Sequence, residues 1–266
     1  MSHAADETPL IVVPVCDDWD ALWPLLARLD DVLAGQGITA RVLIVDDGST
    51  TPPPDDLVTV PLRALGRVEV LGLRRNLGHQ RAIAIGLAYA EEHDGGPVVV
   101  LMDGDGEDDP ADVPRLLERC AQEQGTKIVF AERSWRSESL RFRFGYWLYR
   151  GLYRLLTGRR VRFGNFSAVP RARLRSLVVV SDLWNHYAAA ALKSRQPYCT
   201  VPTRRGRRLG GRSEMNLVGL VVHGLSAISV DSELIGVRLL LVSLLLMVIA
   251  AAGLLVVVGI RVCTRL

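Results

Sequence analysis

The pattern of apolar and polar positions divides the chain into an alternating first half and a strongly apolar C-terminal stretch. Between residues 10 and 131, short apolar runs alternate with longer segments whose apolar residues recur at helical spacing. The runs predict five buried strands, at 10–15, 41–45, 68–73, 98–102 and 127–131. The segments between them predict helices at 19–34, 78–92 and 111–124. This alternation predicts an α/β fold, with a mostly parallel sheet flanked by helices.

The apolar stretch near the C-terminus, residues 239–260, carries no charged side chain. At a rise of about 1.5 Å per residue it extends about 33 Å, which is enough to cross a hydrocarbon core of about 30 Å. A buried core helix is the alternative, but such helices are usually shorter and carry a polar stripe. We therefore predict a transmembrane helix over 237–262, in which Arg238 and Arg261 flank the uncharged run 239–260.

Two further segments have the composition of helices that lie at a membrane surface. Residues 140–157 place Phe144, Leu148 and Leu152 on one face and arginines on another. A helix packed on the core with a solvated basic face would show the same pattern. Residues 214–229 form a second candidate, within a connector at 213–236 that leads into the predicted span.

Charge and cysteine content narrow the function classes. The net charge is only +3, yet arginines crowd residues 133–212 while most acids precede them, so the second half should attract phosphate groups. The four cysteines form no CxxC pair, which argues against a zinc site or a disulfide framework. Residues 1–8 are polar and no signal peptide is visible, so we expect the catalytic part in the cytoplasm.

The strongest local signal is VVVLMDGDGEDDP, residues 98–110, in which a buried strand ends in Asp103 and Asp105. Carboxylates at this spacing can hold a divalent cation and leave coordination positions open for a diphosphate. Gly104 between them lets the backbone approach a ligand closely. Acidic turns after strands are common, so the motif gains weight only from its place after a buried strand, where ligands of parallel sheets bind.

Three other segments carry candidate chemistry, each with a plainer alternative. RVLIVDDGST, residues 41–50, delivers two carboxylates into a glycine turn, or is simply a turn-forming cluster. LRRNLGHQRAIAIGLA, residues 73–88, contains the start of a predicted helix, whose N-terminus could bind a phosphate; alternatively, the residues before it only cap the helix. TRRGRRLGGRSEMN, residues 203–216, suits a phosphate clamp, or is a solvated basic loop beside an anionic membrane.

Together these segments resemble family 2 glycosyltransferases of the GT-A fold, in particular dolichol-phosphate mannosyltransferase and bacterial polyprenyl-phosphate glycosyltransferases. VDDGST resembles the nucleotide-binding VDDGS, and MDGDGEDDP resembles MDADLQDPP. RRNLGHQRAIAIGLA is similar to RNxGxxxAxxxG, GNFSAVPR to the GDFRL-type segment, and RRLGGRSE to RxxGxSK. The resemblance covers nearly the whole chain in order. It implies a GT-A catalytic domain at 1–212.

The resemblance also implies site roles. Metal binding, to Mg²⁺ or Mn²⁺, falls to Asp103, Asp105 and Glu107. Donor binding falls to Pro14, Cys16, Asp18, Asp47, Arg75, Asn76, Asp103, Gly104 and Arg133. The residues at the reacting centre are Asp105, Asn165 and Arg208. The implied partners are a nucleotide-sugar donor (UDP or GDP), a polyprenyl-phosphate acceptor and the bilayer of the inner (plasma) membrane.

The sequence departs from the family pattern in ways that bear on substrate. Cys16, Asp17 and Asp18 stand where tyrosine, asparagine and glutamate are usual, and Asn165 replaces a common aspartate. A lipid phosphate needs little help from a base, whereas a hydroxyl acceptor needs a carboxylate. We therefore expect inverting hexose transfer to a lipid phosphate, for cell-envelope glycan or protein glycosylation.

Two alternatives remain open: a family 2 transferase with a hydroxyl acceptor, and a non-catalytic, membrane-anchored nucleotide-sugar binder. A processive synthase should carry a QxxRW helix and several spans, and the sequence has neither. Nucleic-acid binding would explain the arginines but not the acidic strand ends, so we expect no nucleic-acid partner. A homo-oligomer is neither required nor excluded.

Overall fold

The computed structural model describes residues 8–54, 62–135, 151–158, 163–204, 206, 208–210 and 217–264. Seven strands form one sheet: β1 (Leu10–Val15), β2 (Ala40–Asp46), β3 (Leu65–Gly72), β4 (Val98–Leu101), β5 (Ile128–Trp135), β6 (Ser167–Pro170) and β7 (Tyr198–Arg204). The longer helices are α1 (Trp19–Gly35), α2 (His79–His93), α3 (Val113–Gln122), α7 (Leu217–Ser229) and α8 (Ser232–Cys263). Shorter elements are η1 (Pro110–Asp112), α5 (Arg171–Leu177), η2 (Ser181–Trp184) and α6 (Tyr187–Lys193).

The strand order is β3-β2-β1-β4-β6-β5-β7. All pairings are parallel except those of β6, which runs antiparallel to both β4 and β5. The predicted mostly parallel sheet is thus confirmed, and the five predicted strands appear within a few residues of their expected bounds. Strands β6 and β7 were not predicted, because they are short or contain a proline and lie in the arginine-rich half.

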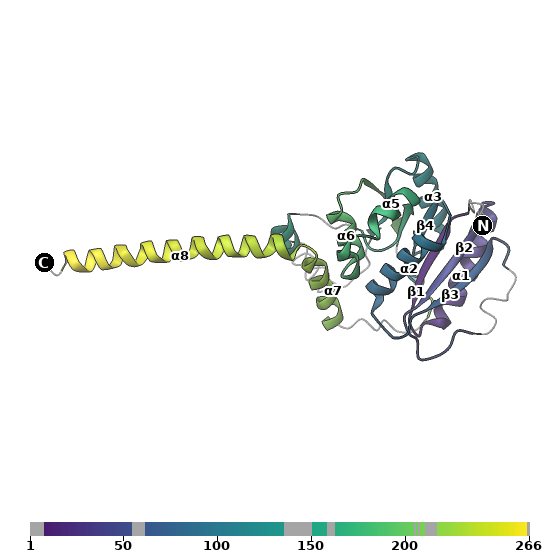
Figure 1. Cartoon of the computed structure of the whole chain (residues 1–266), viewed down its shortest axis with the longest axis horizontal. Helices are drawn as coiled ribbons and strands as arrows, with labels where there is room; N and C mark the ends of the chain where they lie inside the picture. The colour runs from purple at the N-terminus through teal and green to yellow at the C-terminus, as the bar shows by residue number, and fades with distance from the viewer. Residues whose placement is uncertain are drawn as a thin grey trace.

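Helices cover both faces of the sheet, so the central strands are buried on both sides (Figure 1). Along β1, Ile11 and Val13 belong to the apolar cluster that includes α1 and α3, whereas Leu10 and Val12 belong to the cluster that includes α2 and α6. This is why β1 reads as a continuous apolar run rather than an alternating one. Two helical layers around a buried parallel sheet follow directly from that pattern.

Gly86 lets α2 approach the sheet closely. A Cβ at this position would lie 2.7 Å from Val45 Cγ2 and 2.9 Å from Val12 Cγ1. Side chains of β1 and β2 therefore occupy the space that any larger residue would need. The close contact fixes how near α2, which begins at His79, lies to β1 and β2.

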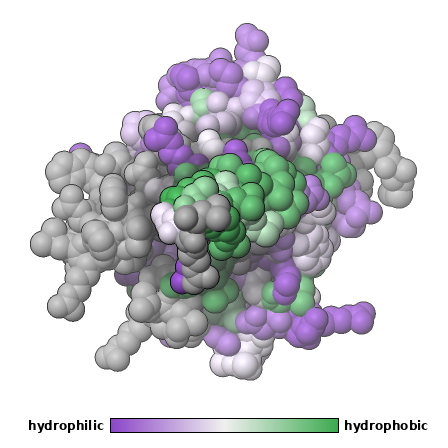
Figure 2. Space-filling model, turned by 90° about the vertical axis from the view of Figure 1, so that its left-hand side faces the viewer, coloured by the Kyte–Doolittle hydropathy of each residue, from purple (hydrophilic) through white to green (hydrophobic). Residues whose placement is uncertain are grey.

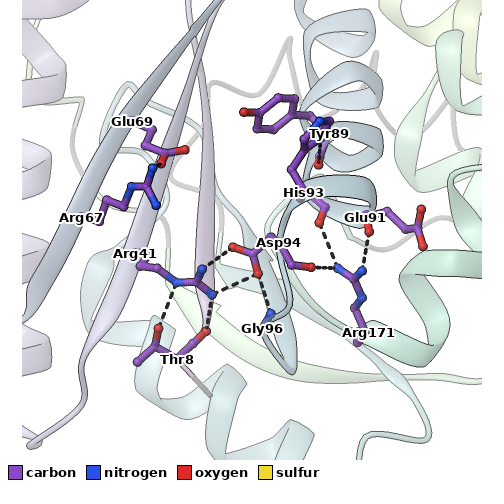
Figure 3. Close-up of polar contacts among 11 residues, drawn as sticks. Thr8, Arg41, Arg67, Glu69, Tyr89, Glu91, His93, Asp94, Gly96 and Arg171 are labelled. Carbon is purple, nitrogen blue, oxygen red and sulfur yellow. Dashed lines mark hydrogen bonds and ion pairs between the residues drawn. The ribbon is translucent and has the colours of Figure 1, made fainter. Parts of the chain in front are cut away.

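A polar network ties together the starts of the parallel strands (Figure 3). Arg41 forms an ion pair of 2.8 Å with Asp94 and donates hydrogen bonds to the Thr8 hydroxyl and carbonyl. The Asp94 carboxylate also accepts from the Gly96 amide at 2.6 Å, and Arg171 donates to the Asp94 carbonyl. The network lies at the sheet edge opposite the carboxyl ends of β1, β2 and β4, so it holds the scaffold rather than the candidate site.

Helix α8 projects away from the domain as a single helix of 32 residues (Figure 1). It is long and apolar enough to cross a membrane, and none of its most apolar window is buried. Viewed from its free end, α8 presents apolar surface in front of the domain, whose coloured surface around it is largely hydrophilic (Figure 2). The predicted apolar helix at 237–262 therefore lies inside a longer helix that begins at Ser232.

A small apolar cluster joins the base of α8 to the domain. Tyr153 of the helical residues 151–157, Ala189 of α6, Ala227 of α7 and Val230 between α7 and α8 pack together. Arg238 of α8 donates to the carbonyls of residues 155 and 156, at 3.2 and 2.6 Å. Of the two predicted interface helices, residues 217–229 of the second appear as α7, and residues 151–157 of the first are helical; residues 140–150 and 214–216 lie outside the described residues.

Candidate active site

The carboxyl ends of three neighbouring parallel strands bring the acidic motifs to one edge of the sheet. β1 is followed by Asp17 and Asp18, β2 ends at Asp46 and is followed by Asp47, and β4 leads into Asp103. Because β1 lies between β2 and β4 in the sheet, these three segments are adjacent in space. Crevices beyond such strand ends are where open α/β sheets bind ligands.

The loop from Asp103 to Asp108 is folded on itself by its own carboxylates. The amide of Asp103 donates to the Asp108 carboxylate at 3.0 Å, and the amide of Glu107 donates to Asp105 Oδ1 at 2.9 Å. Gly104 packs against the end of β1, since a Cβ there would lie 3.1 Å from the Pro14 carbonyl oxygen. Pro14 therefore acts, through its backbone, in shaping the turn that presents the two carboxylates.

Arg208 connects this loop to the end of β1. Its guanidinium donates to Asp105 Oδ2 at 3.1 Å and to Asp18 Oδ2 at 2.7 Å, and its Nε donates to the Gly210 carbonyl at 2.9 Å. The three side chains are each about a quarter exposed. The sequence predicted all three as site residues, and the structure brings them together across 190 residues of chain.

The backbone also fastens the segment around Arg208 to the acidic loop. The amide of Leu209 donates to the Asp105 carbonyl at 3.0 Å, and the amide of Gly206 donates to the Glu107 carbonyl at 2.8 Å. Gly206 is in such close contact that a Cβ would lie 2.5 Å from the Gly106 carbonyl oxygen. This part of the arginine-rich segment is thus docked on the acidic loop.

The electrostatics of the acidic loop suit a divalent cation. Burial raises the pKa of the Asp105 carboxyl, the charges of Asp103 and Glu107 raise it further, and the Glu107 amide and Arg208 act in the opposite direction. Crowded carboxylates of this kind gain from a hard cation, which prefers oxygen ligands. The residues therefore fit Mg²⁺ or Mn²⁺ held mainly by Asp103 and Asp105.

Within the described ranges, no group of three or more His, Cys, Asp or Glu side chains is arranged to hold a metal ion by itself. A site with two protein carboxylates leaves positions for donor oxygens, as the sequence predicted. Glu107 contributes its backbone to the loop, and its role as a third metal ligand stays a prediction.

The residues predicted to line a nucleoside pocket lie at the ends of β1 and β2, beside residues 73–78. Asp47 is buried, and its carboxylate accepts from the amides of Leu77 and Gly78 at 2.7 and 2.8 Å. Cys16 is exposed, and the Asn76 amide donates to its sulfur at 3.2 Å. Asp47 thus holds the loop that carries Arg75 and Asn76, while Cys16 and Asn76 lie together at the surface.

Asp17 links the first two strand ends. Its backbone has a φ of 51°, in the left-handed region, and its carboxylate accepts from the Thr50 amide at 2.7 Å and the Thr51 amide at 3.1 Å. These bonds lower the pKa of Asp17. Its task is to hold the turn after β2 against the end of β1, which the sequence did not indicate.

Asn165 lies at the centre of a second polar cluster. Its side-chain amide is 3.0 Å from His79 Nε2, and its Oδ1 accepts from Gln80 Nε2 at 3.5 Å. His79 Nε2 in turn lies 3.2 Å from Asp103 Oδ1. Partial burial lowers the pKa of His79, but the carboxylates of Asp103, Asp105 and Asp108 outweigh it, so the net shift is upward.

The sequence prediction missed His79 and Gln80, although both follow Gly78 directly at the start of a predicted helix. Gln80 also accepts from the Tyr187 amide at 2.6 Å, and the buried Tyr187 hydroxyl is 2.7 Å from the Ser167 hydroxyl. Arg133 lies in β5 opposite Thr203, and its side chain is outside the described part of the chain. Its predicted role in donor binding, like that of Arg75, stays a prediction.

Comparison with known proteins places this geometry in a family. Residues 10–184 match the family model described as glycosyl transferase family 2. The chain is 28% identical over 216 residues to an undecaprenyl-phosphate 4-deoxy-4-formamido-L-arabinose transferase of Edwardsiella ictaluri, covering 79% of this chain and 64% of that protein. It is 32% identical over 129 residues to the protein of the same name from Pseudomonas aeruginosa, covering 48% and 36%. The chain thus spans less than two thirds of the length of these curated relatives.

Among solved structures, glucosyl-3-phosphoglycerate synthase of Mycobacterium tuberculosis, in complex with Mn²⁺, UDP-glucose and phosphoglyceric acid, aligns with a TM-score of 0.59 at 17% identity. The alignment covers 87% of this chain and 80% of that one, and shows a shared GT-A fold. The family match over residues 10–184 includes the acidic strand ends at Asp47, Asp103 and Asp105 as well as Asn165. The chain therefore belongs to the family 2 glycosyltransferases.

Proposed function

We propose that this chain is an inverting glycosyltransferase that moves a sugar from a UDP- or GDP-sugar to a polyprenyl phosphate, at the cytoplasmic face of the inner (plasma) membrane. The observation that carries the proposal is that Arg208 binds both Asp18 and Asp105 at the strand ends, in a chain that also has a long, exposed apolar helix, α8. A site for a charged, water-soluble donor and an anchor in lipid suit a reaction whose other substrate is a lipid.

The donor half of the proposal rests on the acidic loop and the neighbouring pocket. Asp103 and Asp105 would hold Mg²⁺ or Mn²⁺, which neutralises charge on a departing nucleoside diphosphate. Cys16 and Asn76 bound the space left for the nucleoside, and Asp47 fixes the loop beneath it. Arg208 supplies a guanidinium that can bind phosphate oxygens in a bidentate way.

The acceptor half rests on Asn165. An amide cannot take a proton from a hydroxyl acceptor as a carboxylate can, so this residue favours an acceptor that is already ionised. A lipid phosphate, with a second pKa near ~6, is largely dianionic at neutral pH. Its direct attack on the anomeric carbon, opposite the departing diphosphate, forms the new C–O bond and inverts the configuration.

The helices around the base of α8 would bring the lipid to this edge. Apolar side chains are exposed on 151–157, on α7 and on the first turns of α8; they are Leu152, Leu155, Val221, Val222, Leu225, Leu234 and Val237. Continuity with the candidate span supports the bilayer as the partner of this surface. Helices 151–157 and α7 would then lie at the membrane surface, as their composition predicted.

The names of the curated relatives bear on the donor. Proteins called undecaprenyl-phosphate 4-deoxy-4-formamido-L-arabinose transferase make an amino-pentose derivative a candidate beside the hexose that the sequence resemblance implied. The identity of the sugar is therefore tested with a panel containing both classes. A role in building cell-envelope glycans follows from an undecaprenyl-linked product.

The test is transfer of radiolabelled sugar from UDP- and GDP-donors, hexoses and UDP-4-deoxy-4-formamido-L-arabinose, into organic-extractable lipid. Membranes containing the full chain are compared with and without Mn²⁺, and with the variant Asp105→Ala. Metal-dependent label in the lipid phase that disappears in the variant supports the proposal. Label appearing only on soluble hydroxyl acceptors would overturn it.

A further inference from the structure

Asn165 belongs to a closed ring of hydrogen bonds with Ser167, Tyr187 and Gln80. The Ser167 hydroxyl donates to the Asn165 carbonyl at 2.9 Å, and it lies 2.7 Å from the Tyr187 hydroxyl. The Tyr187 amide donates to Gln80 Oε1 at 2.6 Å, and Gln80 Nε2 donates to Asn165 Oδ1 at 3.5 Å. Tyr187 therefore reaches Asn165 by two routes, through Ser167 to its backbone and through Gln80 to its side chain.

The hydroxyl route has a definite direction. A serine hydroxyl carries a single proton, and the Ser167 hydroxyl uses its proton on the Asn165 carbonyl. The Tyr187 hydroxyl is therefore the donor in its hydrogen bond to Ser167. Burial raises the pKa of the Tyr187 hydroxyl, so it keeps the proton that this role requires.

The hydroxyl route is also the stronger of the two. Its links measure 2.7 and 2.9 Å, whereas the last link of the amide route measures 3.5 Å. Hydrogen bonds weaken beyond about 3.2 Å. Removing the Tyr187 hydroxyl should therefore loosen Asn165 more than removing the Gln80 amide.

Tyr187 is suited to act as a fixed point. Its side chain is fully buried, and its ring centroid lies 6.0 Å from that of Phe130. It begins α6, and at the other end of this helix Lys193 donates to the Val230 carbonyl at 2.7 Å. Helix α6 thus extends from the base of α8 to the ring around Asn165, which is itself only partly buried.

The sheet determines where this ring holds Asn165. Ser167 pairs with Leu101, the last residue of β4, in antiparallel register. Continued by two residues, that register brings Asn165 opposite Asp103, and both lie within hydrogen-bond distance of His79 Nε2. A loosened Asn165 would therefore change the geometry between the acceptor side and the acidic loop.

We propose that Tyr187 is a positioning residue that holds the turn at 163–166, and with it Asn165, chiefly through the Ser167 hydroxyl. The inference rests on the proposed function, in which Asn165 stands on the acceptor side of the reaction. Tyr187 acts through its neighbours, since its own side chain is closed off from solvent. Its loss should slow transfer and leave donor binding intact.

Tyr187→Phe keeps the buried ring and removes only the donor to Ser167. The kcat for sugar transfer should fall about three- to tenfold, the range that one net hydrogen bond accounts for. The KM for the nucleotide sugar should change by less than about twofold, because Cys16 and Asn76 are held by separate contacts.

Ser167→Ala interrupts the same route one step later, so it should lower kcat by a similar factor. The double variant should be no slower than either single variant, since two interruptions of one route remove one restraint. Ile83→Val is the control for lost stability: Ile83 is fully buried in the same apolar cluster as Tyr187, and the change removes one methylene. It should lower Tm and leave kcat unchanged below the unfolding transition.

Hydrogen exchange measured by mass spectrometry reports on the turn without any substrate. In the purified full chain in detergent, Tyr187→Phe should speed exchange at residues 163–166 and leave the buried strand β1 unchanged. Faster exchange, with a loss of kcat that Ser167→Ala matches and does not deepen, supports the inference. Unchanged exchange, unchanged kcat, or losses that multiply in the double variant overturn it. If no donor yields a lipid-linked product, the proposed function fails, and the exchange comparison still decides whether Tyr187 holds the turn.

Discussion

Two adjacent carboxylates, Asp46 and Asp47, offer a sharp test of how the donor edge is built. Nothing in the sequence distinguishes the two residues, but Asp47 is buried and its carboxylate accepts hydrogen bonds from two backbone amides, at 2.7 and 2.8 Å. Asp46 is partly exposed, and its side chain accepts one, from Ser49 at 2.9 Å. The loop of residues 73–78 therefore depends on Asp47 and hardly on Asp46.

The expected cost of Asp47→Asn follows from these contacts. Hydrogen bonds to a charged group contribute about 1.5–3 kcal/mol each, whereas a neutral acceptor contributes about 1 kcal/mol. Asparagine can accept only one of the two amides, and its NH₂ then faces the other amide, donor against donor. The folded state should lose about 3 kcal/mol. For a domain of this size that corresponds to a decrease in Tm of roughly 6–12 °C.

The assay is thermal unfolding of the purified full chain in detergent, followed by tryptophan fluorescence. Asp46→Asn is the matched control, and it should cost about 1 kcal/mol or less because it weakens a single, partly exposed hydrogen bond. Bound UDP-sugar should stabilise the Asp47→Asn protein less than the wild type, since the loop beneath the nucleoside pocket is released. Equal decreases in Tm for the two variants would refute the assignment of Asp47 as the loop's anchor.

Three further predictions follow from the described contacts. Arg41→Met removes a largely buried partner of Asp94 and should lower the free energy of unfolding, measured by chemical denaturation, by about 3 kcal/mol. Arg67→Met, at an exposed ion pair, should lower it by less than about 0.5 kcal/mol. Similar losses for the two variants would contradict the scaffold role of the network around Arg41. Burial raises the pKa of Cys120 to about 11 from 9.0, so at pH 8 its thiolate fraction is about a hundredfold below that of an ordinary thiol. Mass spectrometry after iodoacetamide treatment should therefore find Cys120 unmodified. The exposed Cys16 should react, and bound UDP-sugar should protect it. Arg208→Lys keeps the charge but lacks the planar guanidinium whose two terminal nitrogens each bind one carboxylate, so kcat/KM for transfer should fall about tenfold. An unchanged value would show that the bridge is dispensable.

The parallel half of the sheet was predictable because each strand is an apolar run that ends in polar residues. The positions of Asp103 and Asp105 followed from the same pattern, since ligands bind beyond the carboxyl ends of strands. The antiparallel β6 was not predictable in this way, because its four residues, Ser167–Pro170, carry no periodicity to detect. Its importance comes from pairing with β4 and β5, which no local pattern reports.

Contacts between distant segments were equally hidden. The pairing of Arg208 with Asp18 joins residues 190 positions apart, and residue type alone named both without linking them. His79 was passed over because a histidine after a glycine at a helix start is ordinary in sequence. Only the structure shows that one ring nitrogen of His79 lies near both Asp103 and Asn165.

The hydrogen bonds from Arg238 to the carbonyls of residues 155 and 156 also fix the rotational phase of the anchor. An α-helix turns by about 100° and advances about 1.5 Å with each residue. One alanine inserted in α8 after Arg238 would therefore turn only the apolar part of the helix, which in the proposed membrane-spanning arrangement has lipid on every side. The same alanine inserted between Ser232 and Arg238 would swing the guanidinium about 100° away from its carbonyls and release the catalytic domain to pivot on its anchor.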